Sequence, residues 1–415
     1  MSTSADPLDT FDESALRNFQ EYLRIPSVHP NINYDECVAF LKKQAESLGL
    51  PIRIYCIVTG KPIVVITWVG KEPNLPSIML NSHMDVVPAY EDKWTHKPFS
   101  ADMDSAGNIY ARGTQDMKSV GIQYLEAVRK LKSKKVTLRR TVHITFLPDE
   151  ETGEAGGMKH YVASSHFKDL NVGVVFDEGM PNPTEEFLLF NGERAGWKLH
   201  IHCPGQPGHG SLLHDNTAGE RVLFMLTKMM IFREQEKQKL RNNPDLTLGD
   251  VITLNLTQIS GGVQSNVLPP EFVIVFDCRI PVTVNHDEWE ATLNQWCEEA
   301  GGGTRIEYEH KHDATPVTQL DDSNPYWKAF EKSVEELQLK VSTRIFPADT
   351  DSRHIRVIGI PAFGFSPMNN TPVLLHDHNE YLNITVFLKG IDIYCKLITD
   401  LANLEGDKVR SGRCR

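Results

Sequence analysis

The chain has 415 residues, of which 40% are hydrophobic and 24% are charged, a composition typical of folded globular proteins rather than disordered or fibrous ones. The chain is longer than a domain with one ordinary hydrophobic core, so we expect two domains. The formal net charge of −12 argues against nucleic acid or a membrane as a partner, because nucleic acid and anionic lipid bind basic surfaces.

The cysteines and the N-terminal residues bear on the compartment. The first twelve residues are acidic or small and include no apolar stretch typical of a secretory signal. No segment has the apolar length of a transmembrane helix. The seven cysteines are odd in number and contain no Cys-x-x-Cys pair, which favours reduced thiols. We therefore expect a cytoplasmic protein.

The first part of the chain alternates predicted helices and strands. Apolar residues recur at helical spacing in two segments, and three later segments are rich in Val, Ile and aromatic residues. The helices are expected over 11–24 and 33–49, and the strands over 51–58, 62–69 and 76–81. Beyond the last strand, His83 and Asp85 point to the same side, because side chains alternate along an extended chain. Such a pair is compatible with a metal site or with a local hydrogen bond.

Acidic residues follow three further predicted loop or strand ends. Asp116 precedes a strong helix, where capping is the ordinary role of an aspartate. Strand 141–147 leads into Asp149-Glu150-Glu151, whose charges repel unless solvent or a cation compensates them. Strand 172–176 leads into Asp177-Glu178 in the same way. Open α/β sheets place their chemistry at such carboxyl ends of strands.

From about Gly192 the pattern changes to the order β-α-β-β-α-β, which is typical of a two-layer sandwich. The predicted elements are strand 197–202, helix 217–241, strands 251–259 and 272–280, helix 287–300 and strand 304–310. Helices and strands then alternate again up to a final helix over 384–402. We expect an α/β domain with a mixed central sheet flanked by helices, formed by 1–190 and 314–415, and an inserted α+β domain over 191–313.

The last part of the chain supplies two further metal-ligand candidates, His376 and His378. Two histidines and three carboxylates form a ligand set that suits zinc, although cobalt or manganese would fit nearly as well. One ion would leave ligands unused, whereas two ions bridged by a carboxylate would use all five, with a water or hydroxide between them as nucleophile. Glu150, next to a proposed ligand, is then the expected general base.

Five motifs carry a resemblance to a known family. They are Leu80–Pro88, Tyr110–Lys118, Asp149-Glu150-Glu151, Pro207-Gly208-His209, and Gly364–Pro372 leading to His376. Over about residues 14–402 the chain resembles the M20 metallopeptidases and amidohydrolases. The resemblance implies a zinc-exopeptidase-like catalytic domain, two zinc ions per subunit, and an inserted domain that serves dimerisation and acts as a lid.

The resemblance also implies a role for each motif residue. His83 and Asp177 would hold one zinc ion, and Glu151 and His376 the other, with Asp116 bridging them. His376 is preferred over His378 because the family places this ligand three residues before Asn-Glu, here Asn379-Glu380. The remaining roles implied are an active-site aspartate at Asp85 and the general base at Glu150.

Other motif residues imply substrate contacts and a shared site. His209 resembles a histidine that reaches the active site of a neighbouring subunit, which implies a homodimer formed through the inserted domain. Asn266 and Arg279 match polar groups that hold substrate, and Arg353 matches an arginine that binds the substrate α-carboxylate. Gly210 departs from the alanine usual in the family. The remaining histidines, among them His29, carry no motif and are expected at the surface.

The expected activity is zinc-dependent hydrolysis of N-acyl-L-amino acids, typically N-acetyl, to a free L-amino acid and a carboxylate. An alternative within the family is a dipeptidase or a deacylase of the acetylornithine type. An alternative from a different class is a metal-free binding protein that keeps the fold but has lost one or more ligands. All five ligand types are present in the sequence, which favours an active enzyme.

Overall fold

The structure, a computed structural model, describes residues 8–153 and 156–405. It divides into two compact units. The first contains the described residues up to Asn191, the segment Thr318–Thr343 and the described residues from Thr350 onward. The second contains Gly192–Val317 together with the short segment Arg344–Asp349.

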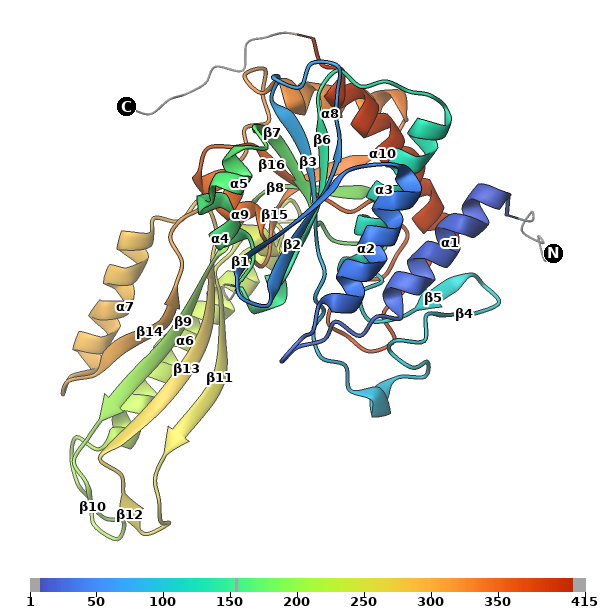
Figure 1. The fold of residues 1–415 in the computed structure, drawn as a ribbon. Coiled ribbons are helices and arrows are strands. Elements are labelled where there is room, and N and C mark those ends of the chain that lie inside the picture. Colours follow the sequence, from blue (N-terminus) through green and yellow to red (C-terminus); the bar gives the residue numbers. More distant parts are fainter. Residues whose placement is uncertain (1–7, 154–155, 406–415) are drawn as a thin grey trace. The chain divides into compact units, whose positions relative to one another are not determined.

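An eight-stranded mixed sheet forms the centre of the first unit (Figure 1). In spatial order its strands are β1 (Ile52–Val58), β2 (Lys61–Trp68), β6 (Val142–Leu147), β3 (Ser77–His83), β7 (Val172–Asp177), β16 (Ala362–Phe365), β8 (Phe187–Glu193) and β15 (Val341–Phe346). The four neighbours β6, β3, β7 and β16 are parallel. His83 is paired in register with Leu147, so the carboxyl ends of these strands lie at one edge of the sheet.

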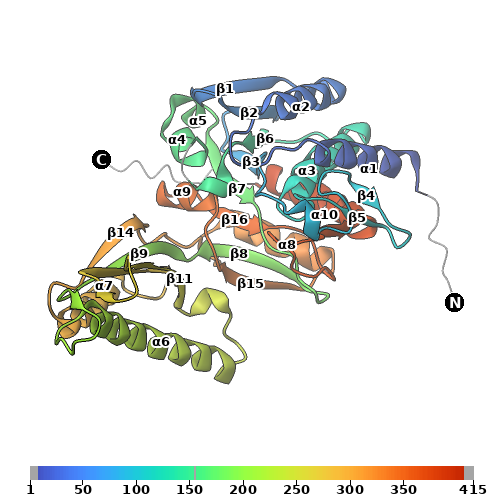
Figure 2. The same cartoon turned by 90° about the horizontal axis from the view of Figure 1, so that it is seen from below.

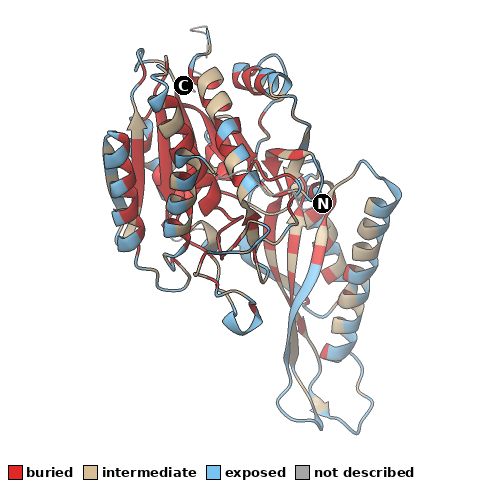
Figure 3. Ribbon diagram, turned by 90° about the vertical axis from the view of Figure 1, so that its right-hand side faces the viewer, coloured by how far each residue is buried: buried red, intermediate tan, exposed pale blue. Residues whose placement is uncertain are grey.

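Helices cover both faces of this sheet because its strands are apolar on both sides. Along β2, Val64 and Ile66 enter one hydrophobic core, whereas Ile63 and Val65 enter another, as the two-residue period of a strand requires. The larger core packs against α1 (Thr10–Leu23), α2 (Asp35–Leu48), α3 (Lys118–Ser133), α8 (Pro325–Glu336) and α10 (Ile384–Ala402). The smaller core packs against α4 (Met158–Ala163), α5 (Ser165–Lys168) and α9 (Ser352–Val357). Figure 3 shows the buried residues concentrated in these strands and in the helix faces that meet them.

The second unit is an antiparallel sheet with two helices on one face (Figure 2). Its strand order is β11 (Thr253–Gly261), β13 (Glu271–Ile280), β9 (Ala195–Pro204) and β14 (Arg305–Lys311), and its helices are α6 (Ala218–Asn242) and α7 (His286–Ala300). A capping box between Thr217 and Glu220 begins α6, and satisfies amide groups that have no partner inside the helix. A separate two-stranded ribbon joins β10 (Gly208–His209) to β12 (Val267–Leu268).

The long helices agree with those predicted from periodicity, and several short elements were not predicted. The polar segment 89–108 contains η1 (Glu91–Lys93) and two short strands, β4 (Asp102–Met103) and β5 (Asn108–Tyr110). Strand β5 pairs with β17 (Tyr381–Asn383), which lies far along the sequence. Such strands depend on a distant partner rather than on a local pattern. Among the described residues, no helix combines the length and apolar character needed to cross a membrane.

Candidate metal centre

His83 stands at the end of β3 with its imidazole buried and oriented. Its Nδ1 lies 2.9 Å from the backbone oxygen of Asp85, to which it can donate. This hydrogen bond leaves the lone pair of Nε2 free for a metal ion. The Nε2 atom lies 3.0 Å from Asp116 Oδ1 and 3.8 Å from Glu178 Oε2. His83, Asp116 and Glu178, here named the first ligand group, bring their ligand atoms within 4.8 Å of one another.

A second ligand group contains Asp116, Glu151 and His376. His376 Nε2 lies 3.2 Å from Asp116 Oδ2 and 3.1 Å from Glu151 Oε2. Asp116 thus presents one oxygen to each histidine, as a bridging carboxylate would. It does not cap α3, because Met117 occupies the N-cap position and makes no side-chain capping hydrogen bond. The ordinary capping role for Asp116 is therefore excluded.

The structure places Glu178, and not the predicted Asp177, in the first ligand group. Asp177 Oδ1 accepts a hydrogen bond of 3.0 Å from Asn81, and its Oδ2 accepts one of 2.8 Å from Ser352. The next residue, Glu178, lies just past the end of β7 and faces His83 instead. Side chains alternate at a strand end, so two adjacent acids face opposite sides. The carboxylate of the first ligand group is Glu178, and Asp177 supports the strand end beside it.

The carboxylates around the histidines form a site that suits cations. Burial and the charge of Glu178 raise the pKa of Glu150 well above its ordinary value, and burial and Asp116 do the same for Glu178. Burial, followed by Asp116, raises the pKa of Glu151 to about 7. Glu151 Oε1 is buried and has no hydrogen-bond donor among the described residues. Bound cations would offset this repulsion and give that oxygen a partner, and imidazole with carboxylate is a ligand set that zinc accepts.

Two acidic side chains position the loops that carry the ligands. Asp85 accepts hydrogen bonds from the backbone amides of Glu150, at 3.2 Å, and of Glu151, at 3.0 Å. Its third donor is His29 Nε2 at 2.9 Å, so the sequence-based expectation of a surface position for His29 is wrong. His29 could not have been found by pattern, because no motif surrounds it. Its contact partner lies 56 positions along the chain.

Glu380 is the second of these acidic residues, and it is fully buried. It accepts 2.7 Å and 3.1 Å hydrogen bonds from the amides of Gln115 and Gly113, and pairs at 2.8 Å with the buried guanidinium of Arg112. The loop before α3 and the loop after β16 are thereby joined. Asp116 belongs to the first loop and His376 to the second, so this contact holds two ligands together.

The remaining predicted residues lie in different places. Arg353, in the first unit, is 9% exposed and donates from Nη2 to the backbone oxygen of Gly153 at 2.7 Å, just after the turn that holds Glu150 and Glu151. His209, Asn266 and Arg279 belong to the second unit.

Within the second unit, the ribbon of β10 and β12 presents His209, which is exposed and contacts Ser211 Oγ at 2.7 Å. Asn266 is also exposed, and its backbone oxygen accepts a 2.7 Å hydrogen bond from Gly210. Arg279 is held by Asp277 at 2.9 Å and by Asp349 at 2.5 Å. These contacts fix the backbone around His209 and Asn266 and the guanidinium of Arg279.

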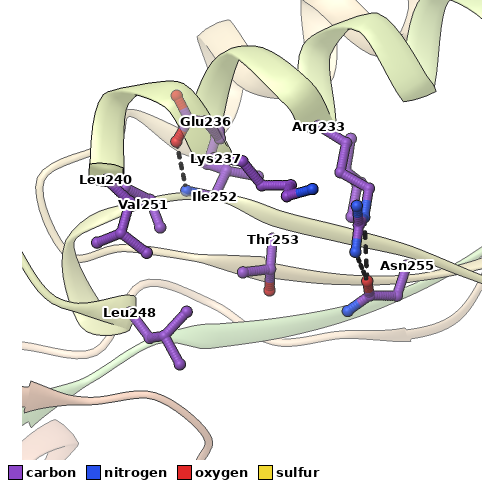
Figure 4. A pocket seen from close by; sticks show the side chains of 10 residues that line it. Arg233, Glu236, Lys237, Leu240, Leu248, Val251, Ile252, Thr253 and Asn255 are labelled. Atoms are coloured by element: carbon purple, nitrogen blue, oxygen red, sulfur yellow. Dashed lines mark hydrogen bonds between the residues drawn. The ribbon is translucent and has the colours of Figure 1, made fainter. Parts of the chain in front are cut away.

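The second unit also contains a cavity of about 210 Å³ between α6 and the start of β11 (Figure 4). At its wall, both Nε and Nη2 of Arg233 donate to Asn255 Oδ1 at 3.2 Å, and Glu236 accepts from the Ile252 amide at 2.6 Å. Its lining also includes apolar side chains, among them Leu240 and Leu254. None of the residues that line it belongs to the predicted site, and it has neither a histidine nor a carboxylate pair to hold a metal ion.

Two ligand groups that share one carboxylate, at the carboxyl ends of parallel strands and next to a further glutamate, define a metal-dependent hydrolase. The model of peptidase family M20/M25/M40 matches residues 79–400, and the chain belongs to this family. The chain is 46% identical over 402 residues to aminoacylase-1 of Mus musculus, an alignment that covers 97% of this chain and 98% of the mouse protein. It is 46% identical over 386 residues to aminoacylase-1 of Homo sapiens, which covers 93% of this chain and 95% of the human protein.

Solved structures show the same fold at low sequence identity. An M20 family metallo-carboxypeptidase from Sulfolobus solfataricus has a TM-score of 0.74 and 18% identity, and the alignment covers 95% of this chain and 99% of the other. Human carnosine dipeptidase 1 has a TM-score of 0.66 and 13% identity, with 95% and 97% covered. The architecture is therefore shared with enzymes whose names indicate different substrates.

Proposed function

We propose that this chain hydrolyses N-acyl-L-amino acids, typically N-acetyl, to a free L-amino acid and a carboxylate. The observation that carries the proposal is Asp116, whose two oxygens face the histidines of two separate ligand groups. The substrate class is supported by the similarity to aminoacylase-1 over nearly the full chain.

We assign the ligands of two zinc ions to these groups. His83 and Glu178 would hold one ion, Glu151 and His376 the other, and Asp116 both. Bound there, the ions would polarise the scissile carbonyl and lower the pKa of an attacking water. The buried, unpartnered oxygen of Glu151 and the four clustered carboxylates support the assignment, because ionised acids in this setting require cations.

Glu150 is the proposed general base. It takes a proton from the attacking water and delivers it to the leaving nitrogen. A carboxyl whose pKa is raised by burial and by Glu178 is suited to accept a proton and then to release it. Asp85 holds the backbone of Glu150, so the base is positioned by a fixed turn rather than by a free loop.

Arg353 is the proposed anchor of the substrate α-carboxylate. It is the arginine whose guanidinium contacts Gly153, directly after the turn of the general base, and a planar fork binds a carboxylate at two points. We propose Asn266 and Arg279 as further substrate contacts from the second unit. Their match to family motifs supports this role.

We further propose a homodimer formed through the second unit, in which His209 acts in the active site of the partner. Strand β11 is an edge strand, exposed over most of its length, and its Ile259 is 56% exposed. Helix α6 exposes Leu223, Met230 and Ile231 by 67%, 46% and 54%. An unpaired edge beside apolar side chains is suited to pair with a second copy.

The proposed compartment is the cytosol. The described cysteines, which are Cys37, Cys56, Cys203, Cys278, Cys297 and Cys395, are all free thiols, as is usual in a reducing compartment. Imaging of a fluorescent fusion would test this, and signal confined to secretory compartments would contradict it.

A substrate panel on zinc-loaded protein tests the proposed activity. We expect kcat/KM for N-acetyl-L-methionine to exceed that for dipeptides and for acetylornithine by at least about tenfold, a difference of about 1.4 kcal/mol in transition-state binding. A matched Glu150→Gln enzyme should retain its zinc and lose about 10²–10⁴-fold in kcat, which excludes a contaminating activity.

Other results of the panel would select another function. Preference for dipeptides or acetylornithine would indicate the dipeptidase or deacylase alternative. Protein that binds no zinc and turns over none of the substrates would indicate a binding protein on the same fold.

A further inference from the structure

We propose that His29 is a positioning residue of the metal centre, which acts through Asp85 on the turn that carries Glu150 and Glu151. The inference rests on the proposed function for its kinetic consequence. The contacts themselves are independent of the substrate, since they join the N-terminal part of the chain to the ligand-bearing loops.

Asp85 is the residue through which His29 acts. Its side chain is fully buried, and its Oδ2 is shared between His29 Nε2 at 2.9 Å and the Glu151 amide at 3.0 Å. Its Oδ1 accepts from the Glu150 amide at 3.2 Å. An ionised carboxylate in this position needs every donor it has. Without the imidazole N–H, the two carboxylate oxygens of Asp85 would accept hydrogen bonds only from the backbone amides of the turn.

His29 is itself held in place by the backbone beside it. Its amide donates to the Val86 carbonyl at 3.3 Å, and the Val86 amide donates back to Ser27 at 2.8 Å. Ser27 Oγ donates to the Met84 carbonyl at 2.5 Å. The segment before His29 thus runs along 84–86 as a short parallel bridge, which places the imidazole against Asp85.

A buried lysine fixes this segment from the other side. Lys118 Nζ donates to the carbonyls of Ile25, at 2.7 Å, and Tyr22, at 3.2 Å. Lys118 begins α3, directly after the loop of Asp116. The segment that carries His29 is therefore tied to two of the three segments that supply ligands to the first group, namely the residues after His83 and the start of α3 after Asp116.

Two roles for His29 predict different results on substitution. If the imidazole donates a necessary hydrogen bond, His29→Gln should replace it, because the glutamine amide nitrogen can reach the place of Nε2, whereas His29→Leu should not. If the ring only fills space, leucine should serve at least as well as glutamine. The side chain is 13% exposed, so its volume alone is a weak constraint.

The experiment compares His29→Leu, His29→Gln and His29→Asn with wild type, each loaded with Co²⁺. The measurements are kcat and KM for N-acetyl-L-methionine, the visible absorption spectrum of the bound cobalt, and cobalt affinity in competition with a chelator. His166→Leu is the matched control. Its imidazole stacks on Tyr55 with ring centroids 4.2 Å apart, away from both ligand groups.

We expect His29→Leu to lower kcat at least about tenfold with KM changed less than about threefold, since misplaced groups cost rate rather than binding. Its cobalt spectrum should change and its cobalt affinity should fall by about 10–100-fold, as for other residues that orient ligands indirectly. His29→Gln and His166→Leu should resemble wild type in all three measurements.

Leucine behaving as wild type, or glutamine as impaired as leucine, would overturn the proposal. If the leucine variant does not fold, glutamine and asparagine decide, since asparagine is one methylene too short to reach Asp85. Equal behaviour of these two would also overturn it. Should wild type fail to cleave N-acyl amino acids, the proposed function falls, and the cobalt spectra and affinities still test His29.

Discussion

At the end of β7 two acidic residues follow each other, and their side chains have different partners. The two carboxylate oxygens of Asp177 accept hydrogen bonds from Asn81 and Ser352. Glu178 is turned toward His83. A longer side chain just past the strand end can reach the histidine, whereas the shorter one is engaged inside the sheet edge.

Substitution of each acid tests this division. We expect Glu178→Gln to bind about one zinc ion fewer per chain and to lose about 10²–10³-fold in kcat/KM, because a ligand and its charge are removed. Asp177→Asn should keep both ions and lose about 1–3 kcal/mol of stability, because one buried acceptor becomes a donor. Elemental analysis after dialysis measures the zinc content. The opposite pattern would restore Asp177 as the ligand.

For single residues, the sequence predicts well which residue types form the ligand groups, and it predicts poorly which of two adjacent acids does so. Four of the five metal ligands proposed from sequence, His83, Asp116, Glu151 and His376, lie in the two ligand groups. The fifth, Asp177, lies outside both groups, and its neighbour Glu178 lies in the first, since the pattern of a strand followed by two acids does not state which acid faces the histidine.

At the scale of elements, the site depends on two irregular loops joined by Glu380. The Glu380 carboxylate accepts hydrogen bonds from the amides of the Asp116 loop and pairs with buried Arg112. Neither loop has a secondary structure that would fix its ligand. Glu380 therefore provides the rigidity that a helix or strand would otherwise supply.

Removing the charge of Glu380 should loosen both loops. We expect Glu380→Gln to cost about 3–5 kcal/mol in the free energy of unfolding, because Arg112 is left as a buried charge without its partner. Zinc affinity should fall at the same time. Urea denaturation measures the stability, with Glu21→Gln as control. Glu21 forms an exposed ion pair with Lys43, and its loss should change stability by less than about 1 kcal/mol. Equal effects of the two substitutions would contradict the role of Glu380.

The secondary-structure elements also differ in how well the sequence predicts them. Long helices and buried strands follow from their apolar periods, and their bounds agree with the prediction within a few residues for α6 and α10. Strand β17 and the pairing of Glu380 with the Asp116 loop join residues more than 260 positions apart, and no local pattern reports such a contact.

At the scale of the whole molecule, the chain passes between the two units four times, at 191/192, 317/318, 343/344 and 349/350. The change of pattern near Gly192 indicates the first passage. The segment Arg344–Asp349 was not expected in the second unit, because its first three residues belong to β15, which follows the predicted end of the inserted domain at residue 313. Asp349 there pairs with Arg279, which is one of the contacts that join this segment to the second unit.

The proposed dimer is tested by mixing two inactive chains. In a random equal mixture of Glu150→Gln and His209→Ala, half of the dimers are mixed, and each mixed dimer has one intact site if His209 acts in the partner. We expect recovery of about a quarter of wild-type activity by this count. Replacing the second chain by a Glu150→Gln, His209→Ala double variant should abolish the recovery. Absence of recovery in verified mixed dimers would place His209 in its own subunit or outside the reaction.

The place of β16 between β7 and β8 has a consequence for synthesis on the ribosome. Both neighbours of β16 leave the exit tunnel long before it does. For nearly half of translation, β7 and β8 therefore lack the strand that lies between them in the complete sheet. His376 and Glu380 emerge later still. A message cut short before their codons would yield a product with its first ligand group encoded and no second one, a protein unable to assemble the paired site whatever the supply of metal.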